Sequence, residues 1–168
     1  MKTRLVLAGI IAGITLAAGL ALGAEQQHGG HQHAVAADAN VPADVKLHND
    51  CAHCGMNRGK FAYSRMLVTY ADGKTAGICS FYCAAIELKN NRGNAVKSVQ
   101  VGDYNSKVLI DAEKAFWVVG GDQRGVMTKT PKWAFAGKQA AEAFIGKHGG
   151  KLATYREALI LAEKDGAK

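Results

Sequence analysis

The sequence predicts a single α+β domain made of two β-β-α-β units with antiparallel sheets. The order strand, strand, helix, strand occurs twice along the chain, and successive strands joined by short turns pair antiparallel. An N-terminal signal and a polar stretch precede these units. Without them, the rest of the 168 residues is still long enough for one domain with its own core.

The first 24 residues are predicted to be a signal peptide. Lys2 and Arg4 precede an apolar run from Leu5 to Leu22, and small residues before Glu25 offer a cleavage site. An uncleaved membrane anchor is the alternative, because the apolar run approaches the length of a membrane span. No cysteine lies near the cleavage site, so no lipid anchor is predicted. The mature protein is therefore expected in the periplasm.

Residues 25–46 are predicted to be a flexible leader, and the domain is expected to cover residues 47–168. The leader is rich in Gln, Ala, Gly and Asn, and it contains His28, His31 and His33. A histidine-rich tract can capture metal ions transiently, but a polar linker without that role fits the composition equally well.

The first unit is predicted to form a hairpin, a helix and a third strand. Asp72-Gly73 is a turn signal between two β-prone runs. Apolar residues then recur at helical spacing from Phe81 to Leu88, and Ser80 can cap the start of this helix. The predicted elements are strands at 61–70 and 75–79, a helix that starts at 81 and ends at 90–93, and a strand at 96–104.

The second unit is predicted to repeat this order. Its helix is closed by Gly149-Gly150, which permits the backbone conformation found after helix C-termini. The predicted elements are strands at 107–110, 115–120 and 133–136, a helix over 138–147, a short strand and a terminal helix over 155–164.

The run Cys51-Ala52-His53-Cys54-Gly55-Met56 is the most informative motif of the chain. It places two thiols, an imidazole and a thioether within six residues, and its glycine lets the backbone turn sharply so that side chains converge. Cys79 and Cys83 follow at i, i+4 spacing, which puts both thiols on one helix face. Such soft ligands select Cu(I), Zn(II) or iron–sulfur clusters over hard cations. The alternative is that the four cysteines pair as disulfides in an oxidising compartment.

Two methionines are further candidate ligands. Met56 stands in a polar segment without the apolar pattern that would bury it, which favours ligation over packing. Met127 lies in a loop-like segment of the second unit, at a place roughly equivalent to the cysteine motif of the first. Met66 lies within a strand pattern and is expected in the core. His53 is interpreted either as a metal ligand or as a solvent-facing turn residue.

Several classes of protein do not fit these residues. Covalent haem attachment requires CxxCH, but Gly55 follows Cys54. A thioredoxin-like pair requires CxxC beside a βαβ unit, whereas an antiparallel hairpin is predicted here. The sequence shows no phosphate-binding glycine loop and no convincing acid–base pair, so no enzymatic activity is predicted. The net charge of +7 is spread without blocks of like sign, which argues against a nucleic-acid partner.

Several segments of the chain follow one another in a distinctive order. They are Cys54-Gly55-Met56, the Asp72-Gly73 hairpin, Lys114 to Gly120, Met127, Trp133-Ala134-Phe135, and the Ala140 to Phe144 helix before Gly149-Gly150. Over about residues 48–160, this order and spacing resemble the NosL family, accessory proteins of nitrous oxide reductase. The resemblance implies an exported Cu(I)-delivering metallochaperone with a duplicated β-β-α-β fold, usually lipid-anchored, that supplies copper for the reductase's copper–sulfide centre.

By this resemblance, the implied Cu(I) ligands are Cys54, Met56 and Met127. The sequence departs from the family pattern in two respects. It lacks the lipoprotein cysteine, and it carries three cysteines beyond the usual single one.

The expected function is therefore that of a periplasmic metallochaperone, which holds Cu(I) in an exposed thiolate and thioether site and passes it on by ligand exchange. The expected recipient is a copper enzyme, nitrous oxide reductase, or its membrane assembly complex. Two rival interpretations remain open. One is a structural zinc cage made by all four cysteines, and the other is a thiol–disulfide oxidoreductase that uses Cys51 and Cys54.

Overall fold

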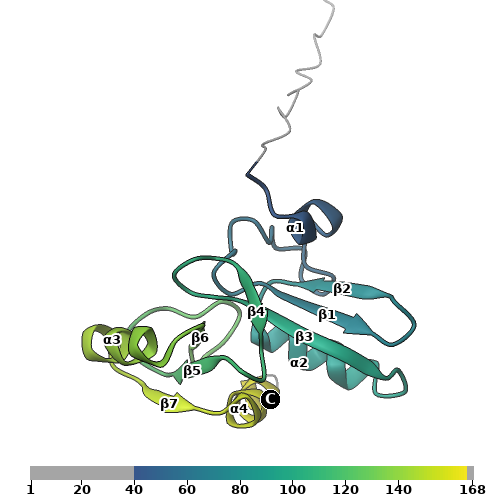
Figure 1. Cartoon of the computed structure of the whole chain (residues 1–168). Coiled ribbons are helices and arrows are strands. Elements are labelled where there is room, and N and C mark those ends of the chain that lie inside the picture. The colour runs from purple at the N-terminus through teal and green to yellow at the C-terminus, as the bar shows by residue number, and fades with distance from the viewer. Residues whose placement is uncertain (1–39, 166–168) are drawn as a thin grey trace, which may run out of the picture. The chain divides into compact units, whose positions relative to one another are not determined.

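A computed structural model describes residues 40–165 of the chain (Figure 1). The predicted signal peptide and most of the predicted leader lie outside the described residues. The elements are, in chain order, α1 (Ala43–Leu47), β1 (Met66–Tyr70), β2 (Thr75–Ile78), α2 (Phe81–Asn90), β3 (Val96–Gly102), β4 (Leu109–Asp111), β5 (Phe116–Val119), β6 (Lys132–Phe135), α3 (Lys138–His148), β7 (Lys151–Ala153) and α4 (Tyr155–Asp165).

The strands form two antiparallel sheets that are built in the same way. The first sheet has the order β2-β1-β3-β4, and the second has the order β6-β5-β7. In each unit the first strand lies at the centre, the second strand pairs on one side, and the third strand returns to the other side after a helix. The predicted α+β class with two β-β-α-β units is thus confirmed.

The strand predicted at 107–110 does not belong to the second unit. As β4 it pairs antiparallel with β3, with Ile110 opposite Val101, and it forms an edge of the first sheet. A tight turn causes this pairing: the Asp103 N–H donates to the Val108 carbonyl at 2.8 Å, and the Lys107 N–H donates to the Asp103 carbonyl at 2.9 Å. Such a short connection returns the chain beside the strand that it has just left.

The core follows the alternation of β1 and the apolar faces of the helices. Met66, Val68 and Tyr70 all lie on the buried face of β1, so the predicted core position of Met66 is confirmed. Figure 1 shows α2 along one face of the first sheet, and α4 packs between α2 and β5. In the second sheet, Trp133 and Phe135 pack with Phe144 of α3.

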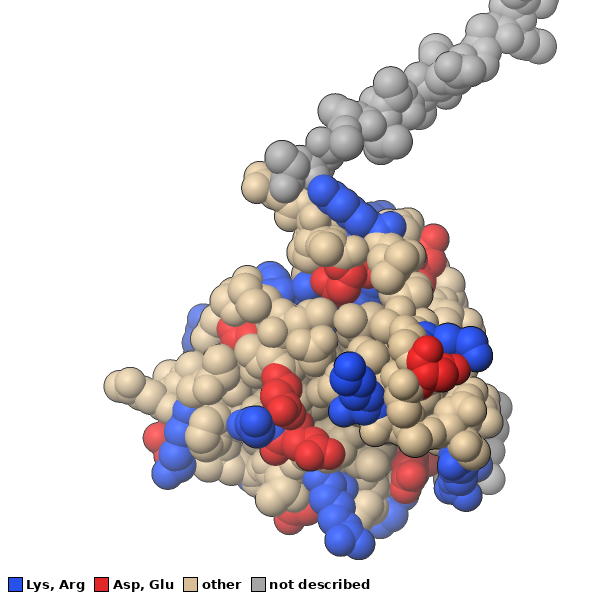
Figure 2. Space-filling view, turned by 45° about the vertical axis from the view of Figure 1, so that its right-hand side comes forward, with Lys and Arg blue, Asp and Glu red and all other residues tan. Residues whose placement is uncertain are grey.

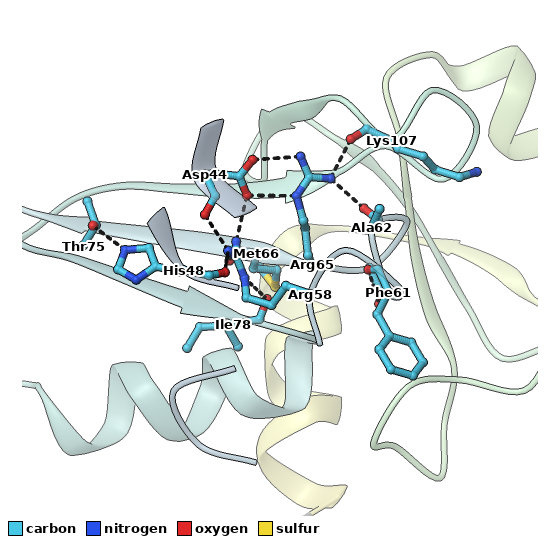
Figure 3. A network of polar contacts seen from close by, with 11 residues as sticks. Asp44, His48, Arg58, Phe61, Ala62, Arg65, Met66, Thr75, Ile78 and Lys107 are labelled. Carbon is cyan, nitrogen blue, oxygen red and sulfur yellow. Dashed lines mark hydrogen bonds and ion pairs between the residues drawn. The ribbon is translucent and has the colours of Figure 1, made fainter. Parts of the chain in front are cut away.

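Helix α1 is held by a buried ion-pair network (Figure 3). The Asp44 carboxylate accepts hydrogen bonds from Arg58 Nη2 at 2.8 Å, Arg65 Nε at 2.9 Å and Arg65 Nη2 at 3.0 Å. Both arginine side chains are almost fully buried, and Arg58 also donates to the Met66 carbonyl of β1. These two buried guanidinium groups need Asp44 as their counter-ion, so Asp44 belongs to the folded domain. The domain therefore starts before residue 47, within the segment that was predicted as the leader.

The surface carries charges of both signs. On the face shown in Figure 2, Lys and Arg side chains are interspersed with Asp and Glu side chains. Among residues 40–165, no helix combines the length and the apolar composition that a membrane span requires.

Candidate metal centre

The four cysteines gather into one cluster where the first sheet meets α2. Their sulfur atoms all lie within 4.8 Å of one another. The Sγ atoms of Cys54 and Cys79 are 3.3 Å apart, and those of Cys79 and Cys83 are 3.8 Å apart. No disulfide joins the four, which are free thiols. Four soft sulfur atoms at these separations fit a thiophilic ion such as Cu(I) or Zn(II).

A compact turn presents Cys51 and Cys54. The Cys51 N–H donates to the Met56 carbonyl at 2.9 Å, and the Gly55 N–H donates to the Cys51 carbonyl at 3.0 Å. Gly55 has a φ of 70°, a left-handed conformation that a residue without a Cβ adopts at little cost. The Ala52 N–H also donates to the Gly77 carbonyl, which ties the turn to β2.

The other two cysteines flank the start of α2. Cys79 directly follows β2, and Ser80 is the N-cap, whose hydroxyl accepts the Cys83 N–H at 3.5 Å. Cys83 therefore lies in the first helical turn, where the unpaired N–H groups and the helix dipole favour negative charge. The structure thus brings Cys79 and Cys83 close to Cys51 and Cys54, and whether all four bind one ion stays a prediction.

The three buried cysteines of the cluster shift one another's pKa. Hydrogen bonds from Cys79 and Cys83 lower the pKa of Cys51 against the opposing effect of burial, and the backbone N–H groups of His53 and Cys54 add to the lowering. The hydrogen bond to Cys51 is the largest cause that raises the pKa of Cys79 and of Cys83, and burial raises both further. A metal ion that binds these sulfur atoms therefore has to displace protons, above all those of Cys79 and Cys83, whose pKa values are raised.

Cys54 is the cysteine through which the cluster reaches solvent. It is half-buried, whereas Cys51, Cys79 and Cys83 are each at most 4% exposed. A ligand from another molecule can therefore approach the cluster at Cys54 without unfolding of the domain.

In the reduced, metal-free protein, Cys54 is expected to react with iodoacetamide before the other three cysteines. Reactivity depends on both thiolate character and access. The pKa of Cys51 is lowered, but its buried sulfur does not meet the reagent, so access decides the order. Peptide mass spectrometry after brief labelling measures this order, and early labelling of Cys79 or Cys83 would contradict it.

His53 does not belong to the group of four clustered side chains, and its ring instead contacts α2. Its Nε2 atom lies 2.7 Å from Oε2 of Glu87, a buried carboxylate that also accepts the Tyr70 hydroxyl at 2.6 Å and Asn91 Nδ2 at 3.0 Å. Burial is the main cause that raises the pKa of Tyr70, and the hydrogen bond to Glu87 raises it further. The contact joins the cysteine turn to the helix that carries Cys83. Sequence reasoning missed Glu87. The sequence did hold a signal for it, because a carboxylate four residues after Cys83 on the apolar face of a helix needs a polar partner.

The two candidate thioethers occupy different environments. Met56 is partly buried and packs against the core cluster that includes Cys51. Met127 is 44% exposed and has a φ of 52° in the β5–β6 loop. The residues on either side of it, Val126 and Thr128, line a small crevice with Ser80, so this loop reaches the start of α2.

A buried ion pair anchors the loop that carries Met127. Lys132 Nζ lies 2.7 Å from Asp165 Oδ2, and both side chains are largely excluded from solvent. Burial lowers the pKa of Lys132, while Asp165 opposes this effect. Thr128 donates its hydroxyl hydrogen bond to the same carboxylate. The position of Met127 is therefore set by contacts with α4 as well as by the loop sequence.

The fold and the cluster together define a small α+β protein with a sulfur-rich site suited to soft metal ions. The family model for NosL matches residues 42–159, and the chain belongs to the NosL family. The structure is similar to the crystal structure of the copper chaperone NosL from Shewanella denitrificans, with a TM-score of 0.52 and 29% sequence identity over 64% of this chain and 87% of that chain. No curated protein matches the sequence.

Proposed function

We propose that this protein is a Cu(I) metallochaperone and that the four-cysteine cluster holds its copper. The observation that carries the proposal is the gathering of four thiols within 4.8 Å, with Cys54 reaching solvent. Thiolates prefer Cu(I) over harder ions. Membership of the NosL family and the similarity to a copper chaperone support copper as the cargo.

Release of the cargo requires a ligand exchange that the geometry permits. A sulfur or nitrogen ligand of a recipient would approach beside Cys54, bind the ion, and leave the buried thiols to recover their protons. Met56, which shares the turn with Cys54, and Met127, on the exposed loop, are the proposed thioether ligands of the exchanging ion. The protein itself catalyses no reaction in this scheme.

The proposed recipient is a copper enzyme of the periplasm, namely nitrous oxide reductase or its membrane assembly complex. The family resemblance supports this recipient. The apolar run that follows Lys2 and Arg4 supports export.

A structural zinc site is the second candidate function. Three buried cysteines beside Cys54 form an almost closed four-thiolate set, which is the usual arrangement of structural zinc. Such a cage would hold its ion until the domain unfolds, whereas a chaperone exchanges its ion from the folded state.

The metal identity separates these two functions. Protein purified without oxygen is expected to contain copper or to be metal-free, and the reduced metal-free form is expected to take Cu(I) from a competing chelator. Elemental analysis and chelator competition measure both. In a second step, the loaded protein is expected to raise the copper content of metal-free nitrous oxide reductase. One tightly held zinc that only denaturation releases would contradict the chaperone proposal.

Replacing Met56 or Met127 by leucine is expected to weaken Cu(I) binding by about tenfold while the fold persists. Leucine preserves volume and hydrophobicity, so the change in stability should stay below about 1.5 kcal/mol, whereas a thioether ligand is lost. Met66→Leu is the matched control, because Met66 is fully buried in the core and is expected to leave Cu(I) affinity unchanged. Parent-like Cu(I) affinity in both test variants would show that neither thioether is a copper ligand.

A further inference from the structure

A pocket that is separate from the cysteine cluster lies at the junction of the two sheets. It has a volume of about 390 Å³, within the range of small-molecule sites. Its lining comes from the segment before β1, the β3–β4 turn, the β5–β6 loop and β6. The lining residues are Tyr63, Tyr104, Asn105, Lys107, Gln123, Arg124 and Trp133.

Three aromatic rings form the wall of this pocket. The ring centroids of Tyr63 and Tyr104 are 6.1 Å apart, and those of Tyr104 and Trp133 are 5.3 Å apart. The two tyrosine hydroxyls have no hydrogen-bond partner among the described residues. Burial is the main cause that raises the pKa of Tyr63, and the charge interaction with Tyr104 raises it further. The hydroxyl of Tyr63 therefore stays protonated and available as a donor.

The two charged residues that line the pocket, Lys107 and Arg124, are both positive. Arg124 is exposed and has no acidic partner within residues 40–165. Lys107 Nζ lies 5.4 Å from the centroid of the Tyr104 ring. No Asp or Glu of the described chain lines the pocket. Two cations without a counter-ion, set beside a low-dielectric aromatic wall, concentrate a positive potential there.

One buried donor of the wall is also unsatisfied. Trp133 is 2% exposed, and its Nε1–H has no acceptor in the described structure. A buried N–H without an acceptor costs free energy, so a water molecule or a bound ligand has to supply one. By contrast, the Nε1–H of Trp117 donates to the Ala112 carbonyl at 2.8 Å.

The wall of the pocket is held in place before any ligand binds. The Asp122 N–H donates to the His148 carbonyl at 2.9 Å, and Gln123 Nε2 lies 3.0 Å from His148 Nδ1. The Tyr104 N–H donates to the Ala134 carbonyl at 2.8 Å. Such preorganisation lowers the entropy that a ligand would otherwise lose on binding.

We infer that this pocket binds a small organic carboxylate, with the carboxylate at Arg124 and the tyrosine hydroxyls and the apolar part against the aromatic wall. A guanidinium group pairs with a carboxylate in a bidentate geometry, and the aromatic rings favour an organic molecule over an inorganic anion. The inference goes beyond the proposed copper function and does not depend on it.

Titration of metal-free, reduced protein with benzoate tests this inference by the indole signals in a 1H–15N correlation spectrum. The chain has only two tryptophans. The Trp133 indole signal is expected to shift and saturate, while that of Trp117 stays. Benzamide, which lacks the charge, and inorganic phosphate, which lacks the apolar part, are each expected to bind at least about tenfold more weakly.

Variants assign the binding to named groups. Arg124→Gln is expected to weaken benzoate binding by about tenfold, because it removes a charge-assisted hydrogen bond. Tyr104→Phe keeps the aromatic ring and removes only the hydroxyl, and it should also weaken benzoate binding. Arg92→Gln is the matched control, since Arg92 is exposed and lies outside this pocket. No Trp133 shift at about 10 mM benzoate, equal binding of phosphate, or parent-like binding by Arg124→Gln would each overturn the inference.

Discussion

The Cys79→Ser variant is expected to bind Cu(I) at least about 100-fold more weakly than the parent. Cys79 is central in the cluster, because its sulfur lies 3.3 Å from that of Cys54 and 3.8 Å from that of Cys83, and it is the largest cause that lowers the pKa of Cys51. Loss of groups that only orient a metal ligand already costs about 10- to 100-fold in affinity, so loss of a central ligand should cost at least as much. Chelator competition under reducing conditions measures the change.

A second variant, with a check of the fold, keeps this prediction decisive. Cys79 is fully buried, so its replacement requires a check of the fold by circular dichroism. Cys54→Ser changes a half-buried position and is expected to leave the fold intact while it also lowers Cu(I) affinity strongly, because it removes the solvent-facing sulfur ligand. If both variants fold and bind Cu(I) like the parent, the cluster does not hold the copper. If Cys54→Ser alone loses binding, the single-cysteine pattern of the family applies and the remaining cysteines have another role.

The Asp44→Ala variant is expected to lose about 3–5 kcal/mol of unfolding free energy, the typical cost of removing one partner of a buried ion pair. Here the removed carboxylate serves two guanidinium groups, and both Arg58 and Arg65 are at most 1% exposed. A small domain is stable by only about 5–15 kcal/mol, so much of its stability would be lost. Urea denaturation monitored by tryptophan fluorescence measures the difference.

An exposed ion pair provides the matched control for Asp44. Asp72 and Lys74 are 2.8 Å apart, but their side chains are 47% and 82% exposed. Lys74→Ala removes this pair but keeps the turn residue Asp72, and it is therefore expected to leave stability almost unchanged, since solvent screens such pairs. Equal losses in the two variants would show that the burial of the Asp44 network does not determine its contribution. Should Asp44→Ala fail to fold, Asp44→Asn retains most of the volume and tests the charge alone.

The same network has a defined pH dependence. Burial alone would raise the pKa of Asp44, but its hydrogen bonds and charge interaction with Arg65, followed by those with Arg58, outweigh burial and lower the pKa below 3.8. A carboxyl group with a lowered pKa contributes stability above its unfolded pKa, and this contribution is lost as the pH falls through the folded pKa. The parent should therefore lose its stability advantage over Asp44→Asn below about pH 4.

Local sequence signals determined the order of the elements and the residue types of the candidate metal site. Ser80 ahead of an apolar helical pattern and Asp72-Gly73 between two β-prone runs predicted the elements on either side of Cys79. These signals depend on hydrogen bonds and backbone conformations within a few residues of the chain. The CxxCGM motif likewise indicated soft-metal chemistry, because ligand softness is a property of the side chains themselves.

Only the tertiary structure decided which of those residues share a site. Cys79 and Cys54 are 25 positions apart, and their 3.3 Å separation follows from the packing of the cysteine turn against β2 and α2. The same packing turned His53 towards Glu87 and made Asp44 a structural residue of the domain. The strand predicted at 107–110 joined the first sheet because a tight turn returned it to β3. Contacts between distant segments leave no periodic pattern in the sequence, since they depend on how whole elements pack against one another.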